Sequence, residues 1–473
     1  MKNPLCYALI ALTLAGALSG ADTGICDMSG YEGIPKSTNF PVPLDRWAVW
    51  LAFDPDPRKP PSAANHRLPE MNVSEIRRHI WQLWAELTAN SHSARSDVRG
   101  RLPRWETWFP AQDVLKASAG ATVPLTKRLP LFEQVPELQV PIPANPGGSK
   151  FSQSVLYNRP VCSVVVDYGL GRNDIKKCLQ TLADRSVPAF DEPESMALKA
   201  VWYEISADET ESCPELPVWD NRPADPKSPS NDARTWPRNV QIRINPRQKC
   251  TGDEDTVDLD RFYYRKLERS SQILTVGEGP KSGYQILVGM HVITKEIPNW
   301  VWATFWWHDG ALSGDSAFAA DRKGIRFSGN VWRNYLMDFS VDMDRPWRPD
   351  GSPKVTFNPY IEAAFPDGTH SNCMSCHLRA SWPPFPARAT LISSGDGLTL
   401  SQIVVRGSDA APYTYYGEAD QVLNLRFLWS LGRKPDFQLP LLDDRPLATR
   451  AEAILDACPA GMGDRLLLKL QAK

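Results

Sequence analysis

The sequence has no long run of charge of one sign, and after its first residues it has no hydrophobic run of membrane-spanning length. Its 53 basic and 55 acidic residues are mixed along the chain and give a formal charge of -2. This near balance gives no global electrostatic reason to expect nucleic acid as a partner. No stable membrane span is expected once the N-terminal segment is removed, because every later apolar segment is too short.

Motifs of several common enzyme classes are also missing. The chain contains no Gly-rich dinucleotide fingerprint, no phosphate-binding loop and no His-Glu-x-x-His zinc motif. No Ser/His/Asp or paired-carboxylate arrangement can be argued from the sequence. Nucleotide-dependent chemistry and zinc hydrolysis of these kinds are therefore not expected.

The N-terminus is typical of an exported protein. Lys2 gives a positive start, residues 5–18 form an apolar run, and Ser19-Gly20-Ala21 offers the small residues that signal peptidase reads. We expect a signal peptide at 1–21, with an uncleaved N-terminal anchor as the alternative. The mature protein should be periplasmic or otherwise exported.

Cysteine usage agrees with an oxidising compartment. Of nine cysteines, one lies in the N-terminal run and two in a motif described below. The remaining six form an even set that allows up to three disulfides. We expect the local pairs Cys162 with Cys178 and Cys213 with Cys250, with buried thiols as the alternative.

The 42 prolines of this 473-residue chain predict short strands and irregular loops, because proline stops helices and cannot donate in a central ladder. We expect an α+β protein of about two to three domains. A Pro-rich irregular region is predicted at 22–150, with one helix near 73–90. A β-rich domain is predicted at 151–340 and a mainly α-helical domain at 341–473.

The helix near 73–90 has both a start signal and a periodic apolar face. Asn72 and Glu75 form a capping-box-like pair. His79 lies beside the apolar stripe and is interpreted as a surface or packing residue. The stripe consists of Ile76, Ile80, Leu83, Trp84 and Leu87.

Strands are predicted from about residue 151 onward. Residues 160–168 are rich in valine, and 196–206 and 240–244 have strand character. The clearest signal is a hairpin. Its two strands are predicted at 284–295 and 300–308, with a turn at 296–299.

The register of that hairpin brings two histidines onto one face. A turn centred at 297 and 298 would place His291 opposite about Thr304. His308 would lie four residues further along, on the same face of the sheet.

The most specific motif of the chain is Cys373-Met374-Ser375-Cys376-His377. Covalent haem attachment needs two thiols that reach the vinyl groups on one edge of a porphyrin, and an imidazole that reaches the iron from one face. Cys373 and Cys376 would form the thioethers of one haem c, and His377 would be the proximal iron ligand. A thioredoxin-like dithiol or a zinc knuckle fits less well, because the βαβ setting and a second Cys/His pair are missing.

The residues around this motif resemble the single-haem domain of the c-type cytochromes, over roughly residues 341–432. The resemblance implies a metal-binding, iron-containing domain in which Cys373 and Cys376 attach the haem and His377 is an axial ligand. It also implies a helix before the motif and a C-terminal helix packed across it. Residues 418–431 look like that closing helix. The apolar stripe of this segment is Val422, Leu425, Leu428 and Trp429.

The sequence leaves the second axial ligand open. Many single-haem domains use a later Met, but no Met or His occurs between Leu378 and Leu431. The candidates are Met462, His291 or His308, or no protein ligand at all. The hairpin tryptophans could form a wall over the haem, with sheet core as the alternative: Trp300, Trp302, Trp306 and Trp307.

Two further side chains follow the motif closely enough to bond the haem propionates. These are Arg379 and Trp382, each of which could equally be an ordinary solvated side chain.

Two functions are compatible with these features. Electron transfer, with a redox partner protein or a small-molecule oxidant or reductant, is favoured by one haem motif and no other cofactor motif. A peroxidase- or oxidase-like haem enzyme is the alternative, favoured by the missing Met and by the large upstream region. The sequence does not decide whether the protein is an enzyme.

Overall fold

A computed structural model gives the fold of much of the chain. The structure describes residues 26, 31–35, 40–51, 72–92, 96–97, 100–121, 133–134, 151–180, 186–207, 213–219, 238–251, 255–267, 283–297, 299–310, 321–341, 356, 358–362, 373, 377, 380–382, 423–425 and 428–432. The predictions made for the signal peptide, Cys376, Arg379 and Met462 lie outside these residues.

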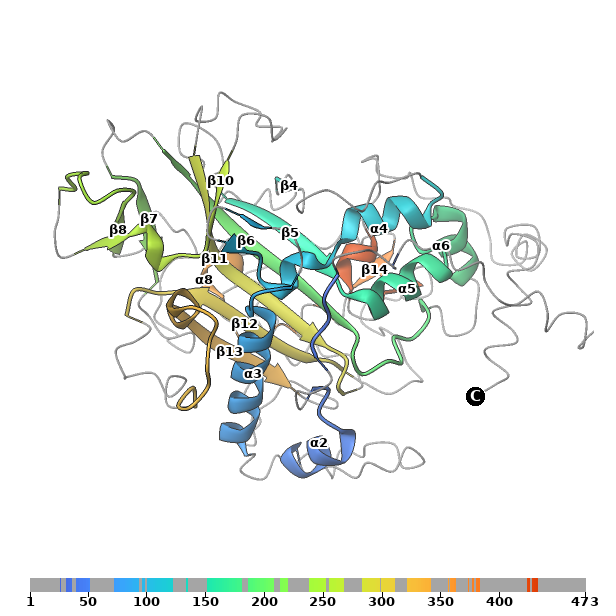
Figure 1. Ribbon diagram of the computed structural model, residues 1–473. Helices are drawn as coiled ribbons and strands as arrows, with labels where there is room; N and C mark the ends of the chain where they lie inside the picture. Colours follow the sequence, from blue (N-terminus) through green and yellow to red (C-terminus); the bar gives the residue numbers. More distant parts are fainter. Residues whose placement is uncertain are drawn as a thin grey trace, which may run out of the picture.

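An eight-stranded sheet occupies the centre of the molecule (Figure 1). Its order is β13-β12-β11-β6-β5-β3, with β10 paired to β11 and β4 paired to β5. All of these pairings are antiparallel. The strands are β3 Phe109–Pro110, β4 Glu133–Gln134, β5 Phe151–Tyr157, β6 Met196–Ser206, β10 Tyr264–Leu267, β11 Gly283–Thr294, β12 Val301–Trp307 and β13 Tyr335–Val341.

Smaller pieces of sheet and several 3-10 turns surround it. The small sheets are β1 Ser96–Asp97 with β2 Gly100–Arg101, β7 Glu215–Val218 with β8 Arg238–Arg243 and β9 Thr256–Asp258, and β14 Ser381–Trp382 with β15 Leu423–Asn424. The 3-10 turns are η2 Arg104–Thr107, η4 Leu259–Arg261, η5 Asn330–Arg333 and η8 Trp429–Gly432.

The described residues include six α-helices. They are α2 Leu44–Leu51, α3 Val73–Leu87, α4 Ala111–Ser118, α5 Arg159–Asp167, α6 Asn173–Gln180 and α8 Pro359–Glu362. Helices α4, α5 and α6 gather at one end of the sheet, together with β14 (Figure 1). None of the helices in the described ranges is long and apolar enough to cross a membrane.

The expected mainly α-helical domain at 341–473 is wrong for the part of it that the structure describes. Its described helical residues are the four-residue α8 and the single positions Cys373 and His377, and the segment predicted as the closing helix at 418–431 contains β15 and the start of η8. The periodic leucines of this segment are buried, but in a cluster that also contains residues of α4, α5, α6 and the large sheet. Tertiary packing therefore overrides the helical period that the sequence displays.

Helix α3 confirms the predicted helix and covers one face of the sheet. Trp84 stacks on Phe305 of β12 with ring centroids 4.2 Å apart, and its indole N–H donates to the Trp332 carbonyl. The buried face of α3 contains the predicted apolar stripe. Asn72 occupies the N-cap position, but its side chain makes no capping hydrogen bond, so the capping-box detail is wrong.

Residues 160–168 were expected as a strand from their valines, and most of them form α5 instead. Asn158 is the N-cap, and its side chain accepts a 3.4 Å hydrogen bond from the Val161 N–H. Pro160 stands in the first turn, where its missing N–H costs nothing. The Asn-Arg-Pro start therefore outweighs the β propensity of the valines.

The predicted hairpin is confirmed. Strand β11 pairs with β12, and His291 lies opposite Thr304 as expected. Trp300, the residue before β12, has a φ of 65°, a left-handed conformation that bulky residues rarely adopt. The turn therefore holds a strained backbone residue next to the start of β12.

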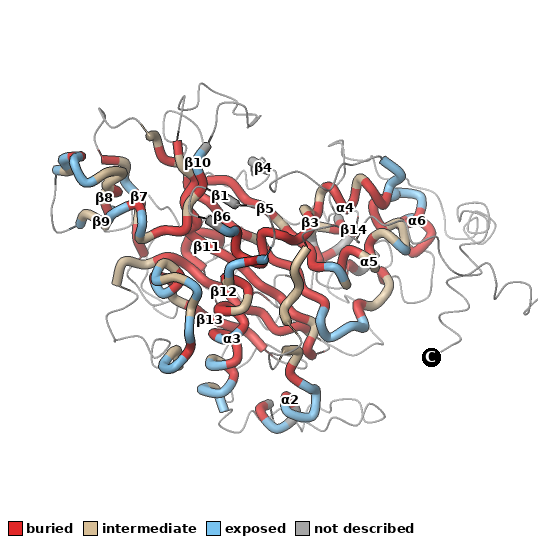
Figure 2. The backbone as a smooth tube through the Cα atoms, viewed as in Figure 1, coloured by how far each residue is buried: buried red, intermediate tan, exposed pale blue. Residues whose placement is uncertain are grey.

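The buried strands contribute to two hydrophobic clusters. Every residue of β12 is buried, and the central strands run as continuous buried tubes (Figure 2). Because successive side chains alternate across a strand, Phe305 and Trp302 face opposite sides of the sheet. Phe305 belongs to the cluster under α3, and Trp302 to the cluster with α4, α5 and α6.

Two disulfides join described cysteines: Cys26–Cys162 and Cys213–Cys250. The second confirms the local prediction. The expected Cys162–Cys178 pair is wrong, because Cys162 bonds Cys26 at the N-terminal side of the chain; Cys178 is disulfide-bonded as well. Sequence spacing gave no sign that an N-terminal segment crosses α5.

Candidate functional site

Two residues of the motif are described, Cys373 and His377, both in helical conformation. Cys373 is a buried thiol, 6% exposed, and is not half of a disulfide. His377 is half-buried. Their spacing of four residues is about one helical turn, so both side chains lie on the same side of that turn.

Trp302 of β12 packs directly against the imidazole of His377. The two ring centroids are 4.7 Å apart and the rings are tilted by 51°. Trp302 is fixed in turn by its indole N–H, which donates to the Asn299 carbonyl at 2.9 Å. The motif therefore lies against the predicted hairpin, at the end of β12 that carries Trp302.

The chain after the motif returns to the same place. The Ala380 N–H donates to the His377 carbonyl, and the Leu425 N–H donates to the Ala380 carbonyl. Trp382 pairs with Leu423 across β14 and β15. Ser430 accepts a 2.5 Å hydrogen bond from the Tyr157 hydroxyl of β5. These bonds fasten the motif segment to the large sheet.

Cys373 belongs to one of the two hydrophobic clusters of the core. The cluster that includes Cys373 draws side chains from the sheet, from α4, α5 and α6, and from the segment after the motif. Its members near the motif include Trp302, Ala380, Trp382, Leu425, Leu428 and Leu431. A flat apolar group attached at Cys373 would thus find aromatic and aliphatic neighbours.

Helix α6 contacts the segment after the motif through two polar side chains. Gln180 Nε2 donates to the Trp382 carbonyl at 3.3 Å. One turn earlier on the helix, Lys176 Nζ lies 5.8 Å from the centroid of the Trp382 ring. Trp382, which the sequence offered as a candidate partner of a haem propionate, is therefore held by α6. Nothing in the sequence of α6 indicated this contact.

His291 lies on the same face of the sheet as Trp302, in the neighbouring strand. Ile293 is directly opposite Trp302, so His291 is its diagonal neighbour, at roughly 7–8 Å by ordinary sheet geometry. His291 Nε2 is 2.9 Å from Glu362 Oε1 of α8. The imidazole therefore has a carboxylate neighbour that would hold the ring in place.

Buried hydrogen bonds hold α8 above this face. Asn358 Nδ2 donates to the Thr304 hydroxyl and to the Phe305 carbonyl, both at 2.8 Å. Glu362 Oε2 accepts from the Asn358 N–H at 2.6 Å. A side chain at Gly289 would approach Asn358 to 3.1 Å, so the small residue there permits the close approach of Asn358.

His308 lies at the opposite end of β12 from the Trp302–His377 contact. Six strand residues separate positions 302 and 308, which amounts to roughly 20 Å. The His308 Nδ1 atom accepts a hydrogen bond from the Gly310 N–H at 2.9 Å. It also lies 3.6 Å from Asp309, which pairs with Arg238. The geometry therefore favours His291 over His308 as a residue near the motif.

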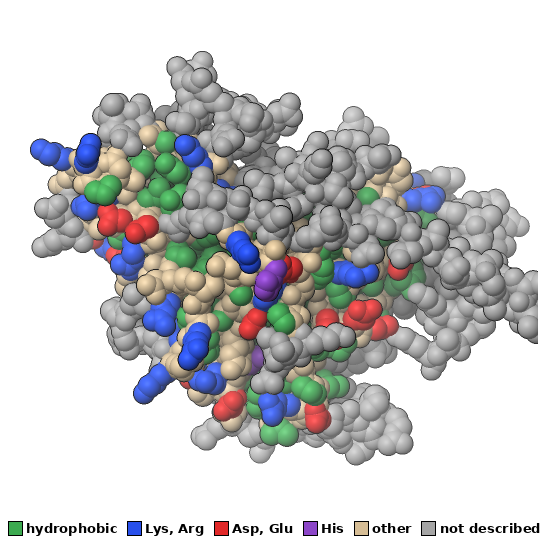
Figure 3. Space-filling view, viewed as in Figure 1, with side chains coloured by type: hydrophobic (Ala, Val, Ile, Leu, Met, Phe, Trp, Pro, Cys, Tyr) green, Lys and Arg blue, Asp and Glu red, His purple; other side chains and the backbone are tan. Residues whose placement is uncertain are grey.

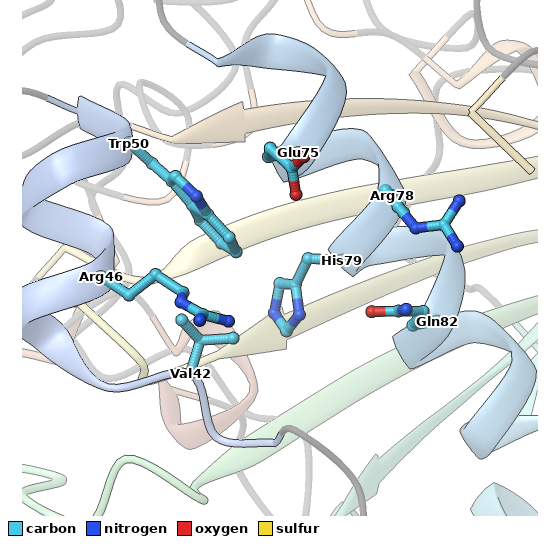
Figure 4. A pocket seen from close by; sticks show the side chains of 7 residues that line it. All are labelled: Val42, Arg46, Trp50, Glu75, Arg78, His79 and Gln82. Atoms are coloured by element: carbon cyan, nitrogen blue, oxygen red, sulfur yellow. The ribbon is translucent and has the colours of Figure 1, made fainter.

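A pocket lies between α2 and α3, on the face of the sheet away from His377. Arg46 and Trp50 reach from α2 toward His79 of α3, with Glu75 above (Figure 4). His79, interpreted from the sequence as a surface or packing residue, is 4% exposed and pairs with Glu296 at 3.0 Å. The imidazole is thus a packed and partnered side chain.

Charges of both signs are spread over the described surface. On the face shown in Figure 3, basic and acidic side chains are interspersed. This agrees with the mixed charge order along the sequence.

The expectation of a metal-binding cytochrome c domain is wrong for the described residues. Past position 341 they form no helical domain, and within the described ranges no three His, Cys, Asp or Glu side chains gather so as to hold a metal ion. No metal centre built from several side chains is proposed there. Haem attachment is a different chemical question, because the porphyrin supplies most of the iron ligands.

Comparisons with protein-family models, with curated proteins and with solved structures gave no significant match.

Proposed function

We propose that the chain carries one covalently attached haem, bound through Cys373 and Cys376 with His377 as an axial iron ligand. The main observation in support is that Cys373 is a buried thiol one helical turn from His377. Aromatic side chains of the sheet and of β14 belong to the same cluster or contact His377. The function that this site supports best is electron transfer to or from a redox partner protein or a small-molecule oxidant or reductant.

The described side chains suit such a group chemically. Trp302 and Trp382 offer flat apolar surfaces, and most other members of the hydrophobic cluster that includes Cys373 are aliphatic. A haem held there would supply a one-electron change between ferric and ferrous iron. The residues of this chain would orient it, and the apolar cluster would limit the access of water to it.

An oxidising compartment is part of the proposal. The two disulfides between described cysteines are compatible with export, and the N-terminal segment resembles a signal peptide. We propose that the mature protein works in the periplasm or a comparable exported location.

The decisive experiment is export in a bacterial host that attaches haem to c-type proteins, followed by analysis of the denatured protein. The wild type should retain a haem-containing mass and a haemochrome spectrum after acid and organic extraction. Cys373→Ala and Cys376→Ala should each lose a thioether, and the double variant should release its haem on extraction.

Met374→Ala is the matched control, because it alters the motif without removing a thiol or the imidazole. It should keep covalent haem. A wild-type protein that is exported and folded, with both disulfides formed but no haem-containing mass, would overturn the proposal.

A haem enzyme is the second candidate, and the His291–Glu362 pair favours it. The His291 imidazole and the Glu362 carboxylate, with Nε2 and Oε1 2.9 Å apart, lie on the sheet face that also carries Trp302 and are groups of the kind that general acid–base catalysis uses. Alternatively, His291 could leave Glu362 and ligate the iron.

Carbon monoxide separates these possibilities. A ferrous protein that binds carbon monoxide readily has an open iron position, which favours the enzyme. If the ferrous wild type does not bind carbon monoxide but the ferrous His291→Ala variant does, His291 is the second ligand and electron transfer is favoured. His308→Ala is the matched control and should behave as the wild type.

A further inference from the structure

Helix α6 buries a lysine beside the segment that follows the motif. Lys176 has no exposed surface (0%), whereas its neighbour Lys177 is exposed. The Nζ atom of Lys176 makes no hydrogen bond in the part of the chain that the structure describes. A fully buried ammonium without a hydrogen bond is uncommon, because buried charges are normally paired.

The interaction that Lys176 does have is too weak to offset its burial. Its Nζ lies 5.8 Å from the Trp382 ring centroid, and a cation–π contact contributes about 0.5–2 kcal/mol. Burying an ion without a partner costs several kcal/mol. Burial accordingly lowers the pKa of Lys176 to about 8. Within the described residues, the position thus has a positive charge without a counter-ion.

The place of Lys176 in the fold indicates where a counter-ion would come from. Trp382 follows His377 by five residues, and its carbonyl accepts a hydrogen bond from Gln180 of the same helix. His377 and the ring that Lys176 contacts are therefore only five residues apart in the sequence. A haem attached at Cys373 would carry two carboxylates, its propionates, on the edge away from the thioethers.

We infer that Lys176 is the counter-ion of a haem propionate, with Trp382 packed beside the same carboxylate. This inference rests on the proposed function. A carboxylate next to Nζ would satisfy the buried ammonium and restore its charge. The positive charge near the porphyrin would in turn favour the ferrous state, because reduction adds a negative charge to the haem.

The test is the reduction potential of the intact haem-loaded protein, measured by spectroelectrochemistry. Lys176→Met keeps the length and burial of the side chain and removes the charge. It should favour the ferric state at least threefold, a fall in potential of about 30 mV for one electron. Lys176→Arg should keep a potential near that of the wild type.

Lys177→Met is the matched control on the same helix. It removes an equal charge from an exposed position, where solvent and salt screen it, and should leave the potential unchanged. A Lys176→Met protein with the wild-type potential would overturn the inference. A fall of the same size in Lys177→Met would also overturn it, since net charge alone would then explain the effect.

Two further measurements keep the inference independent of folding and of the proposed function. If Lys176→Met does not fold, Lys176→Gln, which keeps a donor but not the charge, should show the same fall and a shift of the propionate bands in the resonance Raman spectrum. Unshifted bands would contradict the inference. Haem content measured on the same samples tests the proposed function separately, because haem can be attached whether or not Lys176 pairs with it.

Discussion

Glu296 is buried in the turn of the β11–β12 hairpin, where three partners surround its carboxylate. Oε1 accepts from the Val42 N–H at 2.8 Å and lies 3.0 Å from His79 Nε2. Oε2 accepts from the Thr294 hydroxyl at 2.6 Å. One side chain therefore ties the hairpin turn to α3 and to the segment before α2.

Glu296→Ala should lower the free energy of unfolding by about 3 kcal/mol, because it leaves His79 and the Val42 N–H buried without their partner. Urea denaturation followed by tryptophan fluorescence measures the change. The control is Gln82→Ala, at an exposed position of α3 beside the pocket between α2 and α3. Its free energy of unfolding should stay within about 0.5 kcal/mol of the wild-type value. Equal stabilities for the two variants would refute this role.

The buried charge of Lys176 differs from that of Glu296 in the partners it has. Both side chains are buried and ionisable, but Glu296 has protein partners on both oxygens, whereas the Lys176 ammonium has no hydrogen bond within the described residues. A satisfied buried charge is part of the fold. The unsatisfied ammonium next to the motif segment is the observation that the proposed propionate partner would account for.

Helix α4 packs closely against Gly171, just before the start of α6. The Gly171 N–H donates to the Ser118 hydroxyl at 2.7 Å. A side chain at this position would collide with the Leu115 carbonyl and with Ser118. The close approach of α4 therefore depends on a residue without a Cβ, and α6 brings Lys176 and Gln180 to Trp382 from this point.

Gly171→Ala should cost about 2–3 kcal/mol of unfolding free energy, because α4 or α6 must shift to accommodate the methyl group. In the haem-loaded protein the shift should also move the absorption bands of the haem. Gly120→Ala, at the end of α4, meets no neighbouring atom and carries only the strain of its positive φ of 91°. Gly120→Ala should lower the free energy of unfolding by about 1 kcal/mol and leave the haem absorption bands unchanged. Identical spectra in both variants would show that α6 does not position the haem.

At the scale of the whole molecule, two disulfides close loops of very different length. Cys26–Cys162 joins residues 136 positions apart, and Cys213–Cys250 joins residues 37 apart. The first attaches the N-terminal segment to α5, and Cys162 lies in the same apolar cluster as Cys373. This disulfide therefore stabilises the body on which the motif rests.

Replacing Cys26 and Cys162 together by Ala should lower the free energy of unfolding by about 5 kcal/mol. The corresponding change at Cys213 and Cys250 should cost about 4 kcal/mol, because the closed loop is shorter in the chain-entropy account. Denaturant titrations of the two double variants under identical conditions give the comparison. The reverse order would mean that native-state packing around the disulfides outweighs loop length.

Several local features follow from the sequence by itself, because the residues that cause them are neighbours in the chain. The helical stripe on α3, the strand β6 and the β11–β12 hairpin, with His291 opposite Thr304, were all predictable. Periodicity and turn length fix such features locally. The five-residue motif indicates haem attachment without help from distant residues. Haem attachment stays a prediction made from that motif.

The surroundings of the motif depend on contacts between segments that are distant in the sequence. The helix expected at 418–431 became β15 and η8 because its leucines pack against α4, α5, α6 and the sheet, and Cys162 bonded Cys26 rather than Cys178. The contact of His377 with Trp302, and the burial of Lys176 beside Trp382, join residues 75 and 206 positions apart. No local pattern encodes such contacts, because they depend on how separate segments share one apolar cluster.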